Sequence, residues 1–312
     1  MALNLHSLRL FAAVAEHGGF SRAAAALRVS QPAVSKAVRS LEAQVGLPLL
    51  ERQARGVRLT EAGAALHARA RELYAVERTA EEELLALRGL ERGVLRIGAS
   101  TTVATYLVPP LLGRFRERHP GITLHVTSAN TRAVARLLLQ RRLDTALVEG
   151  PVAHPRLAVR PWREDELVVI APADHPLARA RRVRAEALAA EPFIVREKGS
   201  GTRAVAEAAL AARGLAPRTV MRLGSTEAIK QAVAAGLGLA IVSRFAAEDQ
   251  LALGRLAVIP IADLVIRRPL SQLRVVGRTP SAAAAAFDAL LGLPYRPRET
   301  RRGRARHTGT SS

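Results

Sequence analysis

Near the N-terminus, apolar residues recur three and four positions apart, which is the spacing of one face of an α-helix. Residues 5–17 carry such a stripe and are followed by two glycines, so they predict a helix that ends there. Residues 21–45 predict two more helices, both amphipathic, with a tight turn between them. Ser21 and Ser30 suit the positions where these helices begin, because a serine side chain accepts a hydrogen bond from a free backbone N–H there.

The last of these helices has one polar and basic face. Pro32 suits its first turn, where a missing N–H costs nothing, and Gly46 is expected to end it. The side chains opposite the apolar stripe can hydrogen-bond to base edges and phosphates; they are Gln31, Ser35, Lys36, Arg39 and Ser40. A small three-helix unit with such a helix is typical of helix-turn-helix proteins, which place it in the major groove of DNA.

A β-hairpin is predicted over residues 47–59, with its turn near residues 54–56. It carries Arg52, Arg55 and Arg58 and follows directly on the predicted helix-turn-helix. Such a hairpin resembles a wing that contacts the DNA backbone or the minor groove, where arginine is favoured electrostatically. The alternative is a basic hairpin that is merely solvated.

A long helix is predicted from Thr60 to about residue 88. Apolar side chains repeat in it every seven residues, at Leu66, Leu73, Ala80 and Leu87. This short heptad seam favours pairing of two chains, although Glu77 interrupts the row interleaved with it. The alternative is packing of the helix against its own chain.

From residue 94 onward, strand-like and helix-like segments alternate. Strands are predicted at residues 94–100, 122–128, 144–150, 157–162, 166–172, 192–197, 220–225, 237–243, 255–261 and 270–278. Helices are predicted at residues 103–119, 131–143, 184–190, 201–213, 226–235 and 281–292. Such alternation favours mainly parallel sheets with helices on both faces. The length favours two lobes, with the chain crossing between them near residues 162–166 and 263–269.

The chain therefore divides into four parts. They are a DNA-binding unit at residues 1–60, a linker helix and hinge at 61–90, a two-lobed α/β domain at 91–295 and a basic tail at 296–312. Lobe I is assigned about residues 91–162 and 269–295, and lobe II about residues 163–268. The tail is rich in proline, arginine and glycine, so it is expected to be disordered, and either simply solvated or adding nonspecific affinity for DNA.

The net charge of +20 suggests a nucleic-acid partner, but its distribution weakens this inference. Residues 1–60 hold 8 basic and 3 acidic side chains, a net charge of +5. Residues 91–295 hold 29 and 17, a net charge of +12, so most of the excess lies outside the predicted DNA-binding unit. The 44 arginines against 3 lysines are typical of a GC-rich genome, so the local helix pattern supports DNA binding better than the total charge does.

The composition disfavours several other chemistries. The chain has no cysteine, which excludes disulfides and thiolate metal sites. The eight histidines lack metal-ligand spacing, and no Ser-His-Asp set or convincing carboxylate pair is found, so no metal, no cofactor and no enzymatic activity are expected. Without a signal peptide or a long apolar run, a soluble cytoplasmic protein is expected.

The order of these segments resembles that of the LysR-type transcriptional regulators. The resemblance rests on residues 5–63, which match the family's signature over its whole length. The matching positions are Phe11, Ala23, Ala24, Leu27, Ser30, Gln31, Pro32, Ser35, Leu41, Glu42, Gly46, Leu49, Arg52 and residues 59–63 (LTEAG). Leu50 departs from the signature, because the family usually has Phe there. The α/β domain resembles the family's effector domain, which is like a periplasmic binding protein, so the resemblance covers about residues 3–295.

The resemblance implies a winged helix-turn-helix, a dimerising linker helix and a two-lobed sensor with a small-molecule cleft. It implies as partners promoter DNA, further copies of the chain in a dimer or tetramer, and RNA polymerase. The predicted DNA-contacting residues, which include the three arginines of the hairpin, are Ser21, Ser30, Gln31, Pro32, Ser35, Lys36, Arg39, Arg52, Arg55 and Arg58.

The effector site is predicted from three junctions between a strand and a helix. Ligands of open α/β lobes lie at such junctions, near helix N-termini that present unpaired N–H groups. The junctions at residues 99–102, 198–203 and 224–227 are rich in glycine and hydroxyl side chains. With the serine that ends the strand at 122–128 included, the predicted effector-binding residues are Ser100, Thr101, Thr102, Ser128, Ser200, Gly201, Thr202, Arg203, Ser225 and Thr226.

These residues suit a small anion, because hydroxyls donate hydrogen bonds and Arg203 can bind a carboxylate or phosphate bidentately. The segments around residues 198–203 and 224–243 also resemble the branch of the family that includes Calvin-cycle and cysteine-pathway regulators. Each junction has a simpler explanation, since Ser or Thr at a helix start is often only a cap and Arg203 can pair with Glu197 or Glu207. The sequence thus predicts a DNA-binding regulator controlled by a small anionic metabolite. A solute receptor or an enzyme on the same two-lobed fold is the alternative.

Overall fold

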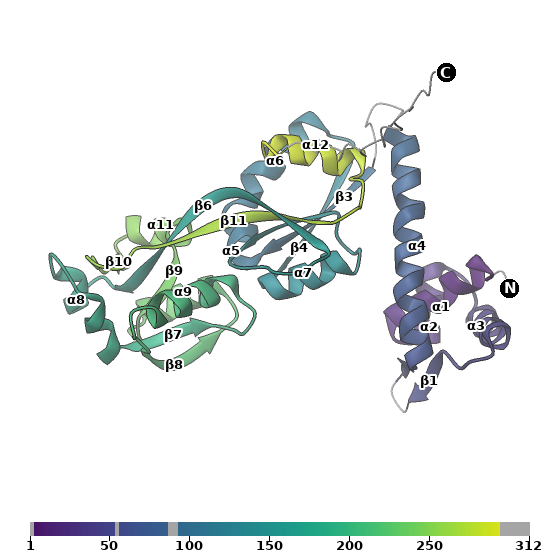
Figure 1. Cartoon of the computed structure of the whole chain (residues 1–312), viewed down its shortest axis with the longest axis horizontal. Coiled ribbons are helices and arrows are strands. Elements are labelled where there is room, and N and C mark those ends of the chain that lie inside the picture. The colour runs from purple at the N-terminus through teal and green to yellow at the C-terminus, as the bar shows by residue number, and fades with distance from the viewer. Residues whose placement is uncertain (1–2, 54–55, 87–92, 294–312) are drawn as a thin grey trace, which may run out of the picture.

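The computed structural model describes residues 3–53, 56–86 and 93–293 (Figure 1). The N-terminal domain consists of α1 (Leu5–His17), α2 (Phe20–Leu27), α3 (Gln31–Val45), β1 (Leu50–Gln53), β2 (Gly56–Leu59) and α4 (Glu61–Ala86). The strands β1 and β2 pair antiparallel as a hairpin. The apolar stripes of the first three helices meet in one core, in which Phe11, Val34 and Leu41 are fully buried. Arg55, residues 87–92 and the tail at 296–312 lie outside the described residues.

The ends of the short helices follow the local sequence with one exception. Ser30 caps α3 by accepting a hydrogen bond from the backbone N–H three residues further on, and Gly46 ends α3 with φ +71°. Ser21 does not cap α2. That helix begins at Phe20 after Gly19, and Ser21 lies exposed within its first turn. The helix starts earlier because Phe20 packs against the three-helix core, so packing rather than the serine side chain sets its first residue.

The larger domain is built from strands and helices that alternate along most of its length. Its elements are β3 (Gly93–Ser100), α5 (Thr101–Tyr106), α6 (Val108–Arg118), β4 (Ile122–Ala129), α7 (Thr131–Leu139), β5 (Thr145–Glu149), β6 (Leu157–Pro172), α8 (Pro176–Arg179), the 3₁₀ helix η1 (Ala185–Ala190), β7 (Pro192–Arg196), α9 (Gly201–Ala211), β8 (Arg218–Leu223), α10 (Thr226–Ala234), β9 (Ala240–Ser243), α11 (Arg244–Ala252), β10 (Leu256–Val258), β11 (Ile266–Val275) and α12 (Ala282–Leu290).

One seven-stranded sheet runs through both lobes in the order β10-β6-β11-β5-β3-β4, and β9 also pairs with β6. The strands β7 and β8 form a separate parallel pair. Although β3 runs parallel to β4 and β5, β6 runs antiparallel to β9, β10 and β11. The sheet is therefore mixed, and the prediction of mainly parallel sheets is wrong. The chain crosses between the lobes on the two long strands β6 and β11 (Figure 1).

The strand β6 is a single element of 16 residues where the sequence predicted two strands, at 157–162 and 166–172. The charged residues between them resemble a turn in the sequence. In the structure they pair with β11, where Asp165 lies opposite Arg268 and Glu166 opposite Arg267. Opposite charges on neighbouring strands stabilise the pairing, so the strand continues through the charged segment.

Two helical segments also differ from the prediction. The helix expected at 103–119 is two helices, α5 and α6, which meet at Leu107 just before the two prolines in the first turn of α6. The helix α11 was not predicted, because the buried face of this segment contains Ala246, Ala247 and Gln250 and therefore shows no strong apolar stripe.

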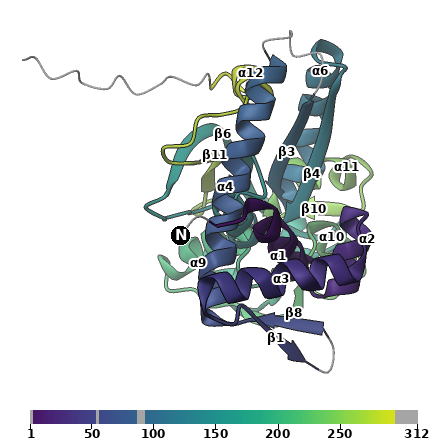
Figure 2. The ribbon, with the colours of Figure 1, turned by 90° about the vertical axis from the view of Figure 1, so that its right-hand side faces the viewer.

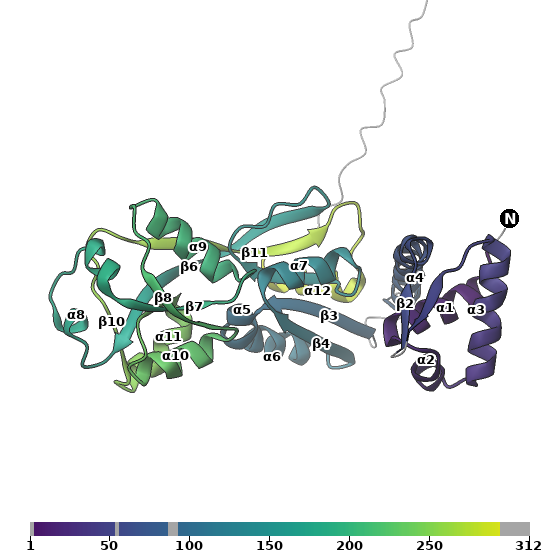
Figure 3. The ribbon, with the colours of Figure 1, turned by 90° about the horizontal axis from the view of Figure 1, so that it is seen from below.

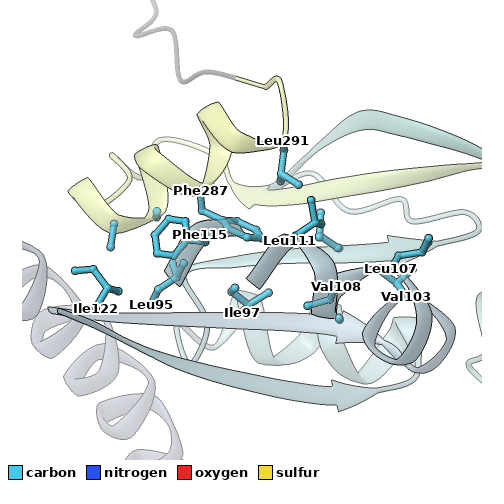
Figure 4. Close-up of a cluster of buried hydrophobic side chains, with 14 of the residues drawn as sticks. Leu95, Ile97, Val103, Leu107, Val108, Leu111, Phe115, Ile122, Phe287 and Leu291 are labelled. Carbon is cyan, nitrogen blue, oxygen red and sulfur yellow. The ribbon is translucent and has the colours of Figure 1, made fainter. Parts of the chain in front are cut away.

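Each lobe has its own core. In lobe I, the C-terminal helix α12 packs over β3 and α6, and the rings of Phe287 and Phe115 meet edge to face with centroids 5.7 Å apart (Figure 4). On the other face of the sheet, Val134 and Leu138 of α7 are fully buried. Lobe II likewise buries apolar side chains on both faces of its strands. Among the described residues, no helix is both long enough and apolar enough to cross a membrane.

Candidate DNA-binding surface and effector cleft

The polar face of α3 lies on the outside of the N-terminal domain. Gln31, Pro32, Lys36 and Arg39 are exposed, whereas the valines and the leucine of the opposite face are buried. The helix lies on the side of this domain that faces away from the two lobes (Figures 1 and 3). In Figure 2 it lies in front of the lobes, close to the hairpin. Nothing in the described part of the chain therefore covers the predicted recognition face.

Ser35 differs from the other residues predicted on this face. Only 8% of it is exposed, because it lies three residues before Val38 and is covered at the edge of the apolar stripe. The prediction that Ser35 faces outward with Gln31 and Lys36 is therefore wrong, and the exposed polar face of α3 is narrower than expected.

A shallow hollow of about 350 Å³ lies beside the N-terminus of α3. Ser21 and Gln31 both line it, together with residues of the hairpin. The hairpin lies close to the turn between α1 and α2. A Cβ atom on Gly56 would lie only 2.6 Å from the carbonyl oxygen of Gly18, so only glycine fits at this position. The structure thus brings Ser21, the start of α3 and the hairpin to one surface.

Arg58 is the hairpin arginine whose side chain the structure describes. Arg58 is exposed and forms an ion pair with Glu51 on the neighbouring strand, with 3.1 Å between Nη2 and Oε2. Arg52 lies on β1 opposite Val57. An exposed ion pair of this kind contributes little free energy, so Arg58 can exchange Glu51 for a phosphate at small cost.

Where the two lobes meet, polar side chains from both lie together, and all of them except Thr101 are buried. We call this group the interlobe polar cluster; it consists of Ser100, Thr101, Thr102, Glu149, Asp165, Arg196, Thr202, Thr226 and Arg268. Arg196 donates to the hydroxyl oxygens of Thr226 at 3.0 Å and of Thr101 at 3.3 Å. Thr101 belongs to lobe I and Thr226 to lobe II, so this one guanidinium links the lobes. The hydroxyl oxygens of Thr102 and Thr226 also lie 3.4 Å apart.

The second arginine of the cluster lies on β11. Arg268 donates from Nη1 to the hydroxyl of Thr202 at 2.8 Å and forms a buried ion pair with Asp165, with 2.6 Å between Nη2 and Oδ2. Ser243 donates to the other oxygen of Asp165 at 2.9 Å. Both arginines therefore have a carboxylate partner. The partner of Arg268 is fully buried, whereas Glu197, the partner of Arg196, is partly exposed.

Glu149 is a buried carboxyl group with no ion pair among the described residues. One oxygen accepts from Thr202 at 3.5 Å, and the other has no hydrogen-bond partner among the described residues. Burial raises the pKa of Glu149, and the nearby Arg268 and Arg196 offset this rise only in part. The hydroxyl of Ser100 is likewise buried without a partner in the described part of the chain. The cluster thus holds two arginines, one carboxylate in a buried ion pair, and two groups with unused hydrogen-bonding capacity.

The structure brings only some of the predicted effector residues into this cluster. Ser100, Thr101, Thr102, Thr202 and Thr226 belong to it. Ser200 and Ser225 instead cap α9 and α10, each accepting a hydrogen bond from a backbone N–H of the first turn. For these two serines, the structure therefore agrees with the simpler explanation that a serine at a helix start is a cap.

Three further predicted residues lie elsewhere. Gly201 is in direct contact with the backbone of Glu149. Arg203 pairs with Glu207 at 2.7 Å, which is also one of the simpler alternatives. Ser128 is exposed on the edge strand β4 and makes no hydrogen bond to the cluster among the described residues, so its assignment to the cleft is not supported.

Sequence reasoning missed Glu149, Asp165, Arg196 and Arg268. Glu149 and Arg196 each end an apolar strand, and a charged residue at that position is a signal that the sequence contains. Asp165 and Arg268 give no such signal, because each lies inside a long strand beside an exposed charged residue. Among the described residues, no group of three or more His, Asp or Glu side chains is arranged to hold a metal ion.

Comparison with known proteins agrees with this architecture. Residues 5–64 match the family of bacterial regulatory helix-turn-helix proteins of the lysR type, and residues 88–292 match the LysR substrate binding domain. A RuBisCO operon transcriptional regulator from Allochromatium vinosum is 40% identical over 287 residues, which cover 92% of this chain and 95% of that protein. The regulator CysL from Bacillus subtilis is 33% identical over 264 residues, covering 85% and 88% of the two chains.

Solved structures give the same result. The regulatory domain of CcmR from Synechocystis, in complex with 2-PG, is 33% identical, with a TM-score of 0.61, over 64% of this chain and 97% of that one. Full-length OxyR from Pseudomonas aeruginosa is 26% identical, with a TM-score of 0.73, over 94% of each chain. The chain therefore belongs to the LysR family of DNA-binding transcriptional regulators, with a helix-turn-helix domain joined to an effector-binding domain.

Proposed function

We propose that this regulator binds a small anionic metabolite in the interlobe polar cluster and that the metabolite controls how the protein engages its promoter. The observation that carries the proposal is the position of Arg196, a buried guanidinium that donates to hydroxyls of both lobes. A guanidinium surrounded by hydroxyl donors suits a carboxylate or phosphate. The complex of the related CcmR domain with 2-PG supports an effector of this class.

The state of Glu149 supports an anionic ligand as well. A carboxyl group whose pKa is raised by burial spends more time neutral, so it repels an anion less and can donate a hydrogen bond. The unpartnered hydroxyl of Ser100 offers a further donor. The ligand can shift the equilibrium between two arrangements of the lobes only to the extent that it binds one arrangement more tightly than the other.

The effector proposal is tested by calorimetric titration of the full chain with 2-phosphoglycolate, the ligand of the CcmR domain. Arg196→Gln removes charge-assisted hydrogen bonds worth about 1.5–3 kcal/mol each, so we expect the dissociation constant to rise at least about tenfold. Thr102→Ala is expected to weaken binding less. Ser128→Ala, which removes a hydroxyl outside the cluster, is the matched control and is expected to leave affinity unchanged. Unchanged affinity in Arg196→Gln would contradict the site.

We infer that α3 reads base edges and that Lys36, Arg39 and the hairpin arginines contact phosphates. In gel shifts on the promoter fragment, Lys36→Ala should weaken binding to all sequences. The slope of the logarithm of the affinity against the logarithm of the salt concentration should fall by the amount expected for the loss of about one phosphate contact. Gln31→Ala should instead relax base preference. Arg181→Ala, which removes an exposed charge from lobe II, is the control for charge alone. Unchanged affinity and specificity in both α3 variants would contradict the assignment.

We further infer that α4 pairs with a second copy of the chain, and that the oligomer acts together with RNA polymerase. Val76 and Leu84 of α4 are 63% and 67% exposed, which leaves apolar surface available for a partner helix. The predicted heptad seam is divided, because Leu66 packs against the core of its own N-terminal domain. In sedimentation experiments, Val76→Glu with Leu84→Glu should dissociate the oligomer, whereas Leu253→Glu on lobe II should not. A double variant that sediments like the unaltered chain would contradict pairing through α4.

A further inference from the structure

A pocket lies between the lobes, beside the interlobe polar cluster. We call it the α7/α9 pocket; its volume is about 580 Å³. Lobe I contributes α7 and residues 151–157, and lobe II contributes residues 198–207. None of the residues of the interlobe polar cluster lines it. This volume is within the range of about 300–1,000 Å³ that is usual for small-molecule sites.

The lining of the α7/α9 pocket is strongly basic. It includes four cationic side chains, from Arg132, Arg136, Lys198 and Arg203, against a single carboxylate, that of Glu207. Glu207 is bound to Arg203 at 2.7 Å. The side chains of the other three cations have no hydrogen bond or ion pair with any described residue. Three unpaired positive charges therefore surround one hollow.

The backbone holds these charges close together. The N–H of Arg132 donates to the carbonyl of Gly199 at 3.2 Å, which joins the first turn of α7 to the loop before α9. Gly199 has φ +93°, and a Cβ on it would lie 3.3 Å from the Cβ of Arg132, so the approach requires glycine. Lys198 is thereby held next to Arg132. Arg132 and Arg136 are four residues apart on one helix, an arrangement of like charges that an isolated helix disfavours.

The rest of the lining can accommodate the apolar carbon skeleton of a ligand. Ala135, Leu139, Val152 and Leu157 contribute apolar surface, and α7 and α9 both begin at the pocket, where their dipoles favour negative charge. We propose that the α7/α9 pocket is a second ligand site, which binds a small phosphorylated metabolite with two or more negative charges and a carbon skeleton. Because such a ligand touches both lobes, it gives the regulator a second input on the arrangement of the lobes. The proposal does not depend on a ligand in the interlobe polar cluster.

The three lysines of the chain allow a direct test with pyridoxal 5′-phosphate, a phosphorylated aldehyde. Its aldehyde condenses with a lysine amine, releasing water, and borohydride reduces the imine to a stable secondary amine that peptide mass spectrometry locates. Lys230 is buried and bound to Glu227, so Lys36 on α3 is the internal comparison for Lys198. We expect Lys198 of the full-length protein to be labelled several-fold faster than Lys36. Pyrophosphate or fructose 1,6-bisphosphate should suppress this labelling more strongly than inorganic phosphate.

Two double variants and one single variant decide the outcome. Arg132→Gln with Arg136→Gln should lower the labelling rate of Lys198 about tenfold, towards that of Lys36. Arg181→Gln with Arg182→Gln removes the same charge from an exposed segment of lobe II and should change nothing. Ser100→Ala, which removes a cluster hydroxyl that has no partner among the described residues, should leave labelling and its suppression intact. Equal labelling of Lys198 and Lys36, no suppression by either polyanion, or unchanged labelling in the α7 double variant would overturn the proposal. Loss of labelling in Ser100→Ala would overturn the separateness of the two sites.

Discussion

Gly201, the first residue of α9, lies where the backbones of the two lobes touch, and its replacement by alanine tests this contact. A Cβ at Gly201 would lie 1.8 Å from the carbonyl oxygen of Glu149 and 2.9 Å from the hydroxyl oxygen of Thr131. On the other side, a Cβ at Gly150 would lie 2.7 Å from the Cα of Gly201. Real Cβ atoms essentially never approach other atoms within 3.0 Å, so Gly201→Ala forces α9 away from β5 by about 1 Å or more.

The cost of this displacement can be worked from the contact. Overpacking of this kind costs about 1–3 kcal/mol, and the better helix propensity of alanine offsets at most about 1 kcal/mol. A net cost of about 1–2 kcal/mol on the contact between the lobes corresponds to about a 5- to 30-fold weaker affinity for a ligand that requires this contact. We therefore expect calorimetry with 2-phosphoglycolate to show that loss in Gly201→Ala, with a lower midpoint of thermal unfolding.

Gly113→Ala is the matched control. Gly113 lies inside α6, and a Cβ there would meet nothing within 4 Å. Alanine in an open helix interior is favoured over glycine by about 0.5–1 kcal/mol, so this variant should be slightly more stable and should bind ligand as before. If Gly201→Ala matched Gly113→Ala in both stability and ligand affinity, the tight contact between the lobes would be refuted.

Three further changes have expected outcomes. Phe287→Ala removes a fully buried ring that packs on Phe115, and urea denaturation should show lobe I less stable by about 3–5 kcal/mol; a loss below about 1 kcal/mol would contradict the packing. Burial raises the pKa of Glu149, so the stability it contributes is fully present below pH 4.5, the value of a free carboxyl group, and is lost as the pH rises through the raised value. Glu149→Gln should therefore raise the unfolding temperature more at pH 8 than at pH 4.5, and a difference independent of pH would count against this cause. Asp144→Asn weakens a buried ion pair with Arg278, whose Nη2 lies 3.0 Å from Oδ1, and chemical denaturation should show a loss of several kcal/mol; full stability in the variant would show that the pair contributes little.

The N-terminal domain could be predicted from sequence in most of its elements. The cap at Ser30, the glycine that ends α3 and the apolar stripe between them act within one or two helical turns, so the pattern of neighbouring residues is enough. The exceptions, Ser21 and Ser35, are positions where packing against other helices decided the outcome. Periodicity indicates which face of a helix is apolar, but the width of that face depends on what covers its edges.

The effector-binding domain was predictable as an alternating α/β fold but not in its strand directions or in its charged residues. The hydrogen bond from Arg196 to Thr101 joins residues 95 positions apart, and that from Arg268 to Asp165 joins residues 103 positions apart. No local pattern records such a pairing. The hydroxyl residues at helix starts were found because their chemistry is local, whereas the arginines that meet them come from other strands.

The sequence by itself determined the helix-turn-helix with its hairpin, the long helix and the succession of strands and helices, because hydrophobic period, caps and glycines act over a few residues. Only the tertiary structure decided that β6 continues through its charged segment and that the hydroxyls of Thr102 and Thr226 come together, with Arg196 donating to Thr226. It also decided that the separate, basic α7/α9 pocket forms between the lobes. These features depend on burial and on charges supplied by distant segments, and both arise only when the lobes have packed together.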